Sequence, residues 1–298
     1  MSEAAAFGAL EATLEERRRQ VEEALGRLRA SGRAPAVQAA LEYSLFAPAK
    51  RVRPVVSLLV AETLRGDPRR IVPAACAVEM AHTASLILDD LPSMDDARAR
   101  RGRPACHVAH GEATAILAAF ALLNRAYEIL AEGWPEGPDA ATRAELARDL
   151  ARAVGLEGMI AGQSEDLRMS ERALDFQTLE FIHSRKTGAL FTCAAALGAA
   201  GARASAAETA AVVAYAKNLG LAFQIVDDLI DATGVAAEAG KDVGQDVKKT
   251  TFVSFSGIDG ARELARELAA TSEEALRAFG PRAQPLRDLA RYVVARRR

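Results

Sequence analysis

Along the first 30 residues, apolar side chains recur at steps of three, four and seven residues. They are Leu10, Leu14, Val21, Leu25 and Leu28. Such spacing places them on one face of an amphipathic α-helix. Alanine, leucine, glutamate and arginine, which favour helix, dominate nearly every later segment as well. Because the alternation typical of strands is missing throughout, the pattern predicts an all-α fold.

Short segments rich in glycine and proline interrupt the helical pattern. They fall at 65–68, 91–95, 132–139, 201–205, 233–244 and 279–285. None is long enough or polar enough to be an interdomain linker. The whole chain, residues 1–298, is therefore predicted to form a single domain, a bundle of about ten or more helices.

Composition narrows the class of protein. Half of the 298 residues are apolar and 26% are charged, so a substantial core is expected. A net charge of −2 favours neither nucleic acid nor an anionic membrane as a partner. The three cysteines, Cys76, Cys106 and Cys193, lie far apart and outside any CxxC pair, which argues against a disulfide framework and a zinc site.

The N-terminal segment lacks the basic start and apolar run of a secretory signal. The longest weakly apolar stretch, LFTCAAALGAAGA, is expected to be too short for a bilayer, which needs about 20 apolar residues. We expect a cytoplasmic protein without stable membrane insertion.

A first acidic cluster ends an apolar helical run. Asp89 and Asp90 follow the run, and Pro92 disfavours helix at Leu91, so the pair lies near a helix C-terminus. The helix dipole is negative there, and each carboxylate costs about 0.3–1 kcal/mol instead of stabilising. Asp95 follows in the loop, so a cation is needed. Magnesium suits an all-oxygen site and takes substrate phosphates as further ligands.

A second cluster lies in the other half of the chain. Asp227 and Asp231 are four residues apart and share a helix face, with Asp228 about 100° around the helix. One such cluster could equally be a solvated acidic face. Two clusters, each entered from an apolar helix, favour a metal site.

Basic residues come in compact groups that complement the acidic clusters. The groups are Lys50, Arg51 and Arg53; Arg98, Arg100, Arg101 and Arg103; Lys186, followed by Thr187; and Lys241, Lys248 and Lys249. Together with the aspartates they suggest a polyanion bound through magnesium and clamped by cations. No Walker-type or GxGxxG loop is present, so a nucleotide is not the favoured polyanion.

The aspartate motifs carry a family resemblance. Asp89-Asp90-LPSM-Asp95 has the form DDxxxxD, and Asp227-Asp228-LI-Asp231 has the form DDxxD. The segments RRGRPACH, GEATAILA, GMIAGQSEDL, HSRKTGAL and GLAFQIVDD accompany them in order. From KRVRP to KKTTF, almost its whole length, the chain resembles the trans-polyprenyl diphosphate synthases.

More narrowly, HTASLILDD, MDDARARRGRP and AILAAFALL resemble the bacterial carotenoid-pathway geranylgeranyl diphosphate synthases. The wider family usually has His before Asp-Asp, where this chain has Leu88, and commonly has Gly-Asp where it has Ala119-Phe120. Both departures fit the carotenoid branch. A third departure concerns the loop before Lys50, where Pro48-Ala49 replaces the usual Gly-Gly.

The resemblance implies a helical bundle around a central cavity, of the isoprenoid synthase type, and a homodimer. It implies three magnesium ions with substrate bound. Their ligands would come from Asp89, Asp90, Asp95, Asp227, Asp228 and Asp231. The allylic diphosphate would be held by Arg100, Lys186, Lys241 and Lys249. Isopentenyl diphosphate would be held by Lys50, Arg53, His82 and Arg101. Thr187 and Gln224 would turn their dipoles toward a carbocation.

The implied reaction is the head-to-tail condensation of isopentenyl diphosphate with an allylic diphosphate, which releases diphosphate. His82 lies seven residues before Asp89, two turns down the same helix face, which favours ligand binding over core packing. Ser85, Ala84 and Ala81 lie about 6 to 12 Å below Asp89. Because all three are small, a geranylgeranyl product is expected over a farnesyl one. Phe120, on the next helix, is expected to close the cavity floor.

Three other interpretations stay open. A di-iron carboxylate bundle would use the ExxH pairs Glu79–His82 and Glu180–His183, but leaves both aspartate clusters unexplained. A class I terpene cyclase shares the helical fold and DDxxD, although its second motif normally mixes Asn, Ser or Thr with Glu. A non-catalytic regulatory subunit of a prenyl synthase would tend to lose one aspartate motif, and both are intact here.

Overall fold

A computed structural model gives the fold and describes residues 3–30, 32–169, 175–233 and 251–296. Helices make up almost all the regular structure in these ranges, which confirms the all-α prediction. The α-helices are α1 (Glu3–Arg27), α2 (Pro35–Leu45), α3 (Val52–Thr63), α4 (Val72–Asp89), α5 (Cys106–His110), α6 (Glu112–Glu132), α7 (Ala140–Val154), α8 (Met159–Met169), α9 (Phe176–His183), α10 (Ala189–Gly201), α11 (Ala206–Ala232), α12 (Phe252–Ala275) and α13 (Gln284–Ala295).

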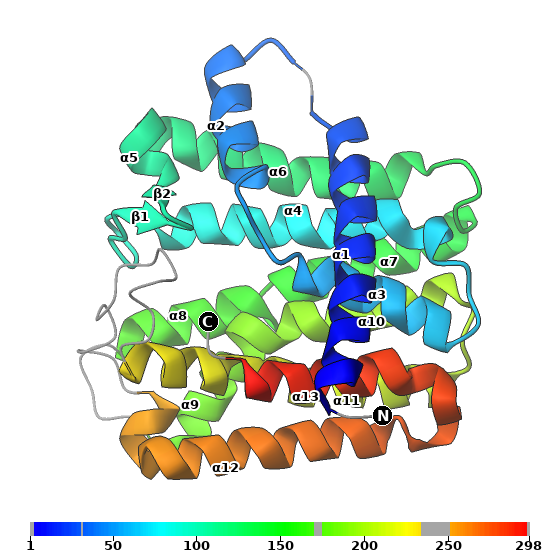
Figure 1. Ribbon diagram of the computed structural model, residues 1–298. Helices are drawn as coiled ribbons and strands as arrows, with labels where there is room; N and C mark the ends of the chain where they lie inside the picture. Colours follow the sequence, from blue (N-terminus) through cyan, green and yellow to red (C-terminus); the bar gives the residue numbers. More distant parts are fainter. Residues whose placement is uncertain (1–2, 31, 170–174, 234–250, 297–298) are drawn as a thin grey trace.

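Shorter elements join these helices. Two 3₁₀ segments, Pro68–Ile71 and Arg277–Ala283, precede α4 and α13, and a π-helix, Ser184–Gly188, joins α9 to α10. In Figure 1, α1 crosses in front of α3, α4 and α13, and it contacts all three. α4 packs against α6 on one side and against α3 and α10 on the other, while α11 packs between α10 and α12. The two aspartate motifs thus lie on α4 and α11, with α10 touching both.

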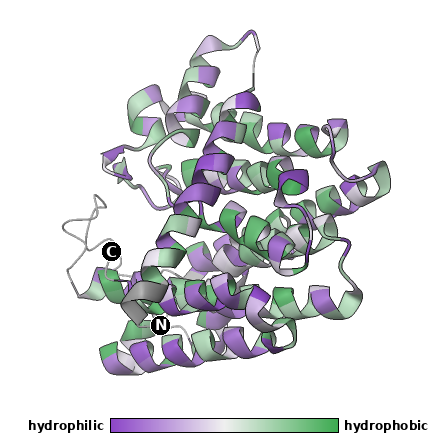
Figure 2. Cartoon of the chain, turned by 45° about the vertical axis from the view of Figure 1, so that its right-hand side comes forward, coloured by the Kyte–Doolittle hydropathy of each residue, from purple (hydrophilic) through white to green (hydrophobic). Residues whose placement is uncertain are grey.

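The predicted amphipathic stripe of the first helix is confirmed. Leu10, Val21 and Leu25 of α1 are buried in the main core, and Leu14 packs against it. Many other core residues are alanines, which let helices approach closely. A smaller apolar cluster joins α9, α11 and α12. Figure 2 shows the same pattern as hydrophilic and hydrophobic bands that alternate along most helices.

Polar side chains mark where several helices begin. Asp139 accepts a hydrogen bond from the backbone N–H of Thr142 at 2.8 Å. Ser205 and Glu208 form a reciprocal capping box at the start of α11. Each such cap satisfies backbone donors that lack a partner within the helix and contributes about 1 kcal/mol. These starts follow the predicted breaks at 132–139 and 201–205.

Two predicted breaks have other outcomes. At 279–285 the 3₁₀ segment runs directly into α13, with only Gly280 in a left-handed conformation at φ 60°. The segment 233–244 begins at Thr233, the residue after α11, and the rest of it lies outside the described residues.

One feature contradicts the expectation that strands are missing. Ala99–Arg100 and Arg103–Pro104 pair as a small antiparallel hairpin, β1 and β2, within the described residues. Its turn is Arg101-Gly102, and both residues have positive φ, 53° and 72°. Positive φ at both central positions is the signature of a type I′ hairpin. The strands are too short for alternation to show in the sequence.

Three helical segments, Pro68–Asp89, Glu112–Glu132 and Ala206–Ala232, are long and apolar enough to cross a membrane by length and composition alone. The sequence argument that no stretch reaches that length is therefore wrong. In the most apolar of them, 72% of the window is buried inside the bundle, so core packing accounts for its apolar character.

Candidate active site

The first aspartate motif turns back on itself after α4. The backbone N–H of Asp95 donates to the carbonyl of Asp89 at 2.9 Å, which brings the two residues together. Partial burial raises the pKa of Asp89 to about 6; Lys186 opposes this rise, and the negative charge of Asp95 adds to it. The ionised form of Asp89 is thus poorly compensated by the protein, which is a setting that favours binding of a cation.

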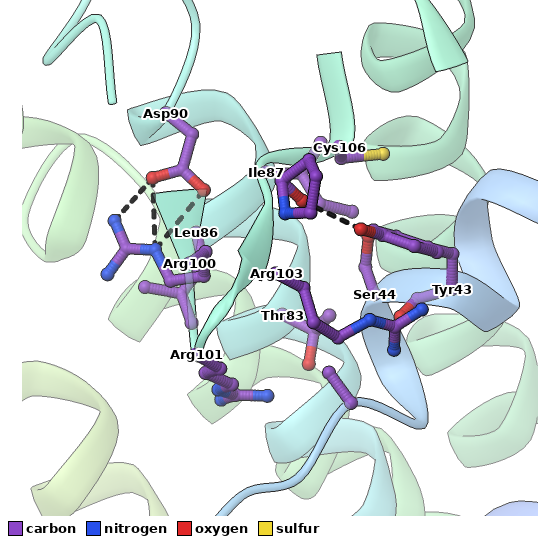
Figure 3. A pocket seen from close by; sticks show the side chains of 12 residues that line it. Tyr43, Ser44, Thr83, Leu86, Ile87, Asp90, Arg100, Arg101, Arg103 and Cys106 are labelled. Carbon is purple, nitrogen blue, oxygen red and sulfur yellow. Dashed lines mark hydrogen bonds and ion pairs between the residues drawn. The ribbon is translucent and has the colours of Figure 1, made fainter. Parts of the chain in front are cut away.

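Asp90 lies in different surroundings from Asp89. It is 2% exposed, and Nε of Arg100 donates to Oδ1 at 3.0 Å and to Oδ2 at 3.2 Å, while Nη2 also donates to Oδ1. Figure 3 shows the carboxylate facing this guanidinium. Burial by itself would lower the pKa of Arg100, but the pair with Asp90 raises it. Both oxygens of Asp90 hold Arg100 in place, so a role of Asp90 as a metal ligand would require it to share or release this contact.

The β-hairpin separates the two neighbouring arginines. Arg100 precedes the turn and faces Asp90, whereas Arg101 lies in the turn and points away (Figure 3). The hairpin is fixed to α2, because the Tyr43 hydroxyl donates to the Pro104 carbonyl at 2.8 Å and Arg103 stacks on the Tyr43 ring at 3.9 Å. The cavity enclosed there is only about 30 Å³, room for ordered water but not for a prenyl chain.

A second cationic group forms between α3 and α4. Nη1 of Arg53 lies 3.1 Å from Nε2 of His82. Because arginine has no acceptor, His82 accepts this hydrogen bond and is neutral. Burial, then Arg53 and Arg101, hold the pKa of His82 well below its usual value. Burial also lowers the pKa of Arg53 to about 10, against the opposing effect of Glu79. The structure thus brings Arg53, His82 and Arg101 together, as predicted, with the exposed Lys50 nearby in the chain.

Lys186 comes from the π-helix Ser184–Gly188. Its Nζ donates to Oδ2 of Asp166 on α8 at 2.7 Å. Burial alone would lower the pKa of Lys186, but Asp166, Asp89 and Asp95 together raise it above its usual value. Lys186 therefore lies between a carboxylate of α8 and the first aspartate motif. Sequence reasoning missed Asp166, although the motif GQSEDL that contains it was visible.

Gly162 of α8 permits this arrangement. A Cβ at position 162 would lie 2.3 Å from the backbone nitrogen of Lys186 and 2.9 Å from the carbonyl oxygen of Ile182. Both are backbone atoms, so they cannot move aside cheaply. Only glycine lets α8 approach the π-helix closely enough for Asp166 to reach Lys186.

Thr187 and Gln224 are joined by a chain of hydrogen bonds that ends on Asp228. The Thr187 hydroxyl donates to Oε1 of Gln224 at 2.9 Å, and Nε2 of Gln224 donates to Oδ1 of Asp228 at 3.0 Å. Oδ2 of Asp228 accepts from the backbone N–H of Phe252, the first residue of α12, at 3.3 Å. Asp228 is 4% exposed and both its oxygens are bonded within the protein, so its predicted role as a metal ligand would require these contacts to be shared or released. Since a carboxylate only accepts, Asp228 fixes which end of the Gln224 amide faces Thr187.

Asp227 is half-buried and already has a cationic partner. Nη2 of Arg296 donates to Oδ1 of Asp227 at 2.8 Å and to the carbonyl of Phe223 at 2.7 Å. The guanidinium also stacks on the Phe223 ring at 3.8 Å. Asp231 lies one turn further along α11 and is half-buried. Arg296 was missed because nothing in the basic run at the end of the sequence distinguishes it.

Within the described ranges, no three side chains of His, Cys, Asp or Glu converge as a metal site. Each motif instead offers two half-buried carboxylates. They are Asp89 and Asp95 in the first motif and Asp227 and Asp231 in the second. This all-oxygen set fits magnesium, which retains waters and completes its coordination with substrate phosphates. The donors fit a metal that binds together with a diphosphate.

The residues predicted to set the cavity depth divide into two groups. Ala81 and Ala84 are buried on α4, and Ser85 is half-buried with its hydroxyl bonded to the His82 carbonyl. Phe120 is 64% exposed, whereas Ala119 beside it is buried. The expectation that Phe120 closes the floor is therefore wrong for a single chain.

Two predicted phosphate ligands, Lys241 and Lys249, lie outside the described residues.

The surroundings of the ExxH pairs argue against a di-iron centre. Glu79 is paired with Arg51 at 2.7 Å, and His82 contacts Arg53. His183 packs against the ring of Phe252, with 5.1 Å between ring centroids. Both members of the first pair, Glu79 and His82, thus already have arginine partners.

Comparisons with known proteins point to one family. The polyprenyl synthetase family model matches residues 34–277. Geranylgeranyl pyrophosphate synthase 9, chloroplastic, of Arabidopsis thaliana is 43% identical over 269 residues, which cover 87% of this chain and 74% of that protein. The chloroplastic geranylgeranyl pyrophosphate synthase of Capsicum annuum is 40% identical over 264 residues, which cover 87% of this chain and 71% of that protein.

Solved structures match the chain in fold over nearly its whole length. An FPP/GFPP synthase from Zymomonas mobilis matches with a TM-score of 0.84 and 32% identity, over 98% of this chain and 100% of that one. A geranyltransferase from Legionella pneumophila matches with a TM-score of 0.85 and 29% identity, over 100% and 99%. Both the sequence and the fold are thus matched over most of their length, and the chain belongs to the polyprenyl synthetase family.

Proposed function

We propose that the chain is a geranylgeranyl diphosphate synthase, which joins isopentenyl diphosphate head to tail to an allylic diphosphate and releases diphosphate. The observation that carries the proposal is the presence of two cationic groups with different surroundings. Arg100 and Lys186 lie beside Asp89 and Asp95, whereas Arg53, with His82, lies among arginines.

The two groups suit two diphosphates with different fates. A diphosphate that must leave its carbon needs charge stabilisation on the departing oxygen, which carboxylate-bound magnesium supplies as a Lewis acid. A diphosphate that stays attached needs only to be held, and arginine forks do this. We therefore assign the allylic substrate to the side of Asp89 and isopentenyl diphosphate to the side of Arg53.

The residues of the chain then have these roles. Lys186 and Arg100 stabilise the negative charge that develops on the leaving diphosphate. The oxygens of Thr187 and Gln224 face the allylic cation. The carbon–oxygen bond of the allylic diphosphate breaks first, and its electron pair leaves with the diphosphate. The double bond of isopentenyl diphosphate then attacks carbon 1 of the allylic cation, and a proton leaves the resulting carbocation. We assign no side chain as the base, and the departing diphosphate is the candidate.

Magnesium would be held by Asp89 and Asp95 on α4 and its loop, and by Asp227 and Asp231 on α11. Three ions per site, with substrate bound, is the number that the family resemblance implies. Titration of the protein with magnesium and inorganic diphosphate, followed by calorimetry, measures the number directly.

The product length is proposed from the small residues below Asp89. Incubation with isopentenyl diphosphate, magnesium and dimethylallyl, geranyl or farnesyl diphosphate in turn, with products sized by mass, tests it. A 20-carbon diphosphate from each starter supports the proposal, and a 15-carbon end product supports the farnesyl alternative. A cyclic hydrocarbon would indicate a terpene cyclase, and a folded protein without turnover a regulatory subunit.

The position of Ala84 gives a sharper test. Ala84→Tyr places an aromatic ring in the path assigned to the tail, and the product is expected to shorten toward farnesyl diphosphate. The product distribution by mass spectrometry is the measurement, with Ala113→Ser on the exposed face of α6 as a control. An unchanged distribution in the Tyr variant would contradict this account of the cavity floor.

We propose that the active form is a homodimer. The support is a set of exposed apolar side chains in stripes on two helical segments, Leu117 and Phe120 on α6 and Leu156, Ile160 and Leu167 on or just before α8. Exposed apolar surface of this kind is typical of an interaction site. Light scattering gives the mass in solution, and Phe120→Asp is expected to shift a dimer toward monomer.

We also place the reaction in the cytoplasm and in carotenoid biosynthesis. Three buried free cysteines fit a reducing compartment, and a 20-carbon product fits the carotenoid branch that the sequence resembles. Cell fractionation tests the first statement. Pigment formation in cells that carry only the later carotenoid enzymes tests the second.

A further inference from the structure

Arg51 lies at the centre of the basic group Lys50-Arg51-Val52-Arg53 but is unlike its neighbours. It is 3% exposed, whereas Lys50 is exposed and Arg53 is half-buried. It also adopts a left-handed backbone conformation, φ 52°, at the residue before α3. A non-glycine residue adopts this conformation at a cost in free energy, so other contacts must hold it there.

The guanidinium of Arg51 supplies those contacts. Nη1 donates to Oε1 of Glu79 on α4 at 2.7 Å. Nη2 donates to the carbonyls of Leu45, at the end of α2, and Ala47, in the following loop, at 2.5 and 3.4 Å. Glu79 is itself 1% exposed. One buried side chain therefore ties the end of α2, the loop and α4 together immediately beside Lys50.

The same face of α4 carries both arginine contacts. Glu79 and His82 are one helical turn apart; Glu79 holds Arg51, and His82 accepts from Arg53. Burial lowers the pKa of Arg53 and of Arg101, and the negative charge of Glu79 opposes this lowering in both, which favours their charged forms. Thus Glu79 acts on the cationic group both through geometry and through charge.

We propose that the buried Arg51–Glu79 ion pair is a positioning device for the isopentenyl diphosphate site, holding the loop and the start of α3 so that Lys50 and Arg53 face the substrate. This inference rests on the proposed function. It assigns neither residue to the substrate itself. Arg51 turns inward where its neighbours reach the ligand, and Glu79 is committed to Arg51 and not to a metal.

A positioning role and a purely structural role differ in what they change. The allylic site is built mainly from other elements, the end of α4, the β-hairpin that carries Arg100, α8, the π-helix and α11. Loss of positioning therefore weakens isopentenyl diphosphate binding and leaves allylic diphosphate binding nearly unchanged. A general loss of structure would weaken both, or would only lower the melting temperature.

The variants for the test are Glu79→Gln, which keeps an acceptor but removes the charge, and the double variant Arg51→Met with Glu79→Met, which removes the pair without leaving a lone buried charge. Arg51→Lys keeps the charge but has one donor group instead of a fork. The matched control is Glu62→Gln at the far end of α3, where Glu62 pairs with Arg17 of α1 at 2.6 Å.

Two measurements are made on each full-length variant. Calorimetry gives the Kd of isopentenyl diphosphate alone, which needs no turnover, and steady-state kinetics give the KM of each substrate. We expect the Kd and the KM for isopentenyl diphosphate to rise at least about tenfold in Glu79→Gln and in the double variant. In Arg51→Lys the Kd and the KM for isopentenyl diphosphate are expected to rise less. The KM for the allylic substrate is expected to stay within about twofold in all variants.

The outcomes separate the two proposals. Variants that melt like the native protein and bind isopentenyl diphosphate equally well overturn the positioning role, and so does an equal rise in both KM values. If the double variant does not fold, Glu79→Gln and Arg51→Lys decide the question alone. A native protein that binds isopentenyl diphosphate without elongating a starter overturns the proposed function. In that case the Kd values of the variants still test whether the Arg51–Glu79 pair positions the binding site.

Discussion

The Asp89-Asp90 pair and the Asp227-Asp228 pair are alike in their second member and different in their first. Asp90 and Asp228 are both buried and bonded internally, to Arg100 in one case and to Gln224 and the start of α12 in the other. Asp89 is half-buried beside other carboxylates, with a raised pKa. Asp227 is half-buried but paired with Arg296 at 2.8 Å.

The two motifs differ in how the negative charge of their first aspartate is balanced in the metal-free protein. At Asp89 the protein leaves negative charge poorly compensated, so a divalent cation relieves repulsion when it binds. At Asp227 an arginine is already paired with the carboxylate, so a metal bound there would have to displace or share this contact. The first motif is therefore expected to bind metal with less rearrangement than the second.

The largest effect is expected from Asp89→Asn. The carboxylate is a proposed magnesium ligand, and with its loss kcat/KM is expected to fall about 10²- to 10³-fold, the range seen when one electrostatic contact to a transition state is removed. The melting temperature should stay level or rise, since a poorly compensated carboxylate is lost. Elongation assays and thermal melts give both quantities. Asp96→Asn, at an exposed neighbouring position, serves as control; a similar loss there would contradict the special role of Asp89.

A smaller but more specific effect is expected from Asp228→Asn. The variant loses a charged acceptor, so the free energy of unfolding is expected to fall by about 1.5–3 kcal/mol. kcat falls because the Gln224 amide is no longer fixed, while the magnesium concentration for half-maximal rate stays unchanged. Asp227→Asn is expected to raise that concentration. If both variants shift the magnesium requirement equally, the two aspartates do not divide their roles.

The raised pKa of Asp89 predicts how stability depends on pH in metal-free protein. Its pKa rises from 3.8 in the unfolded chain to about 6 in the folded one, so the folded state binds more protons in this window. Stability is fully present below about pH 3.8 and is lost as the pH rises through about 6, by up to about 3 kcal/mol, less where solvent screens the group. Urea unfolding in EDTA between pH 4 and 7 measures this change against Asp89→Asn. Equal slopes in the two proteins would contradict the assignment.

The smallest effect is expected from Arg296→Gln. The pair with Asp227 is partly exposed and contributes about 0.2–1 kcal/mol, so its loss should lower the magnesium concentration for half-maximal rate by no more than about fivefold. Arg291→Gln, which loses an exposed pair with Glu273, is the control. A higher magnesium requirement in the Arg296 variant would show that Arg296 assists the loaded site instead of competing for Asp227.

Sequence reasoning reached those features that depend on local spacing. The apolar stripe of α1 follows from helical periodicity, and the place of Asp89 at a helix C-terminus follows from the end of the apolar run and Pro92. The grouping of His82 with Arg53 and Arg101 came from the family resemblance. Helical geometry also placed Asp228 about 100° from Asp227, but the burial of Asp90 and Asp228 was not predicted. The family resemblance supplied the order of the motifs.

The remaining features depend on how helices pack. The pairing of Asp166 with Lys186 requires the close approach at Gly162, and the inward turn of Arg51 requires a left-handed backbone. Phe120 faces outward while its neighbour Ala119 is buried, a choice between adjacent residues that only the position of α6 against α4 decides. No local pattern carries this information.

The π-helix at Ser184–Gly188 limits how this part of the chain can change. A π turn contains one residue more than an α turn, so α10 is rotated by about 100° from where an unbroken continuation of α9 would have placed it. Deletion of a single residue there would turn every side chain of α10 toward new neighbours, and with them the junction that carries Lys186 and Thr187. The length of this segment is thus constrained more strictly than its composition, and gaps in it should be rarer among functional variants than substitutions.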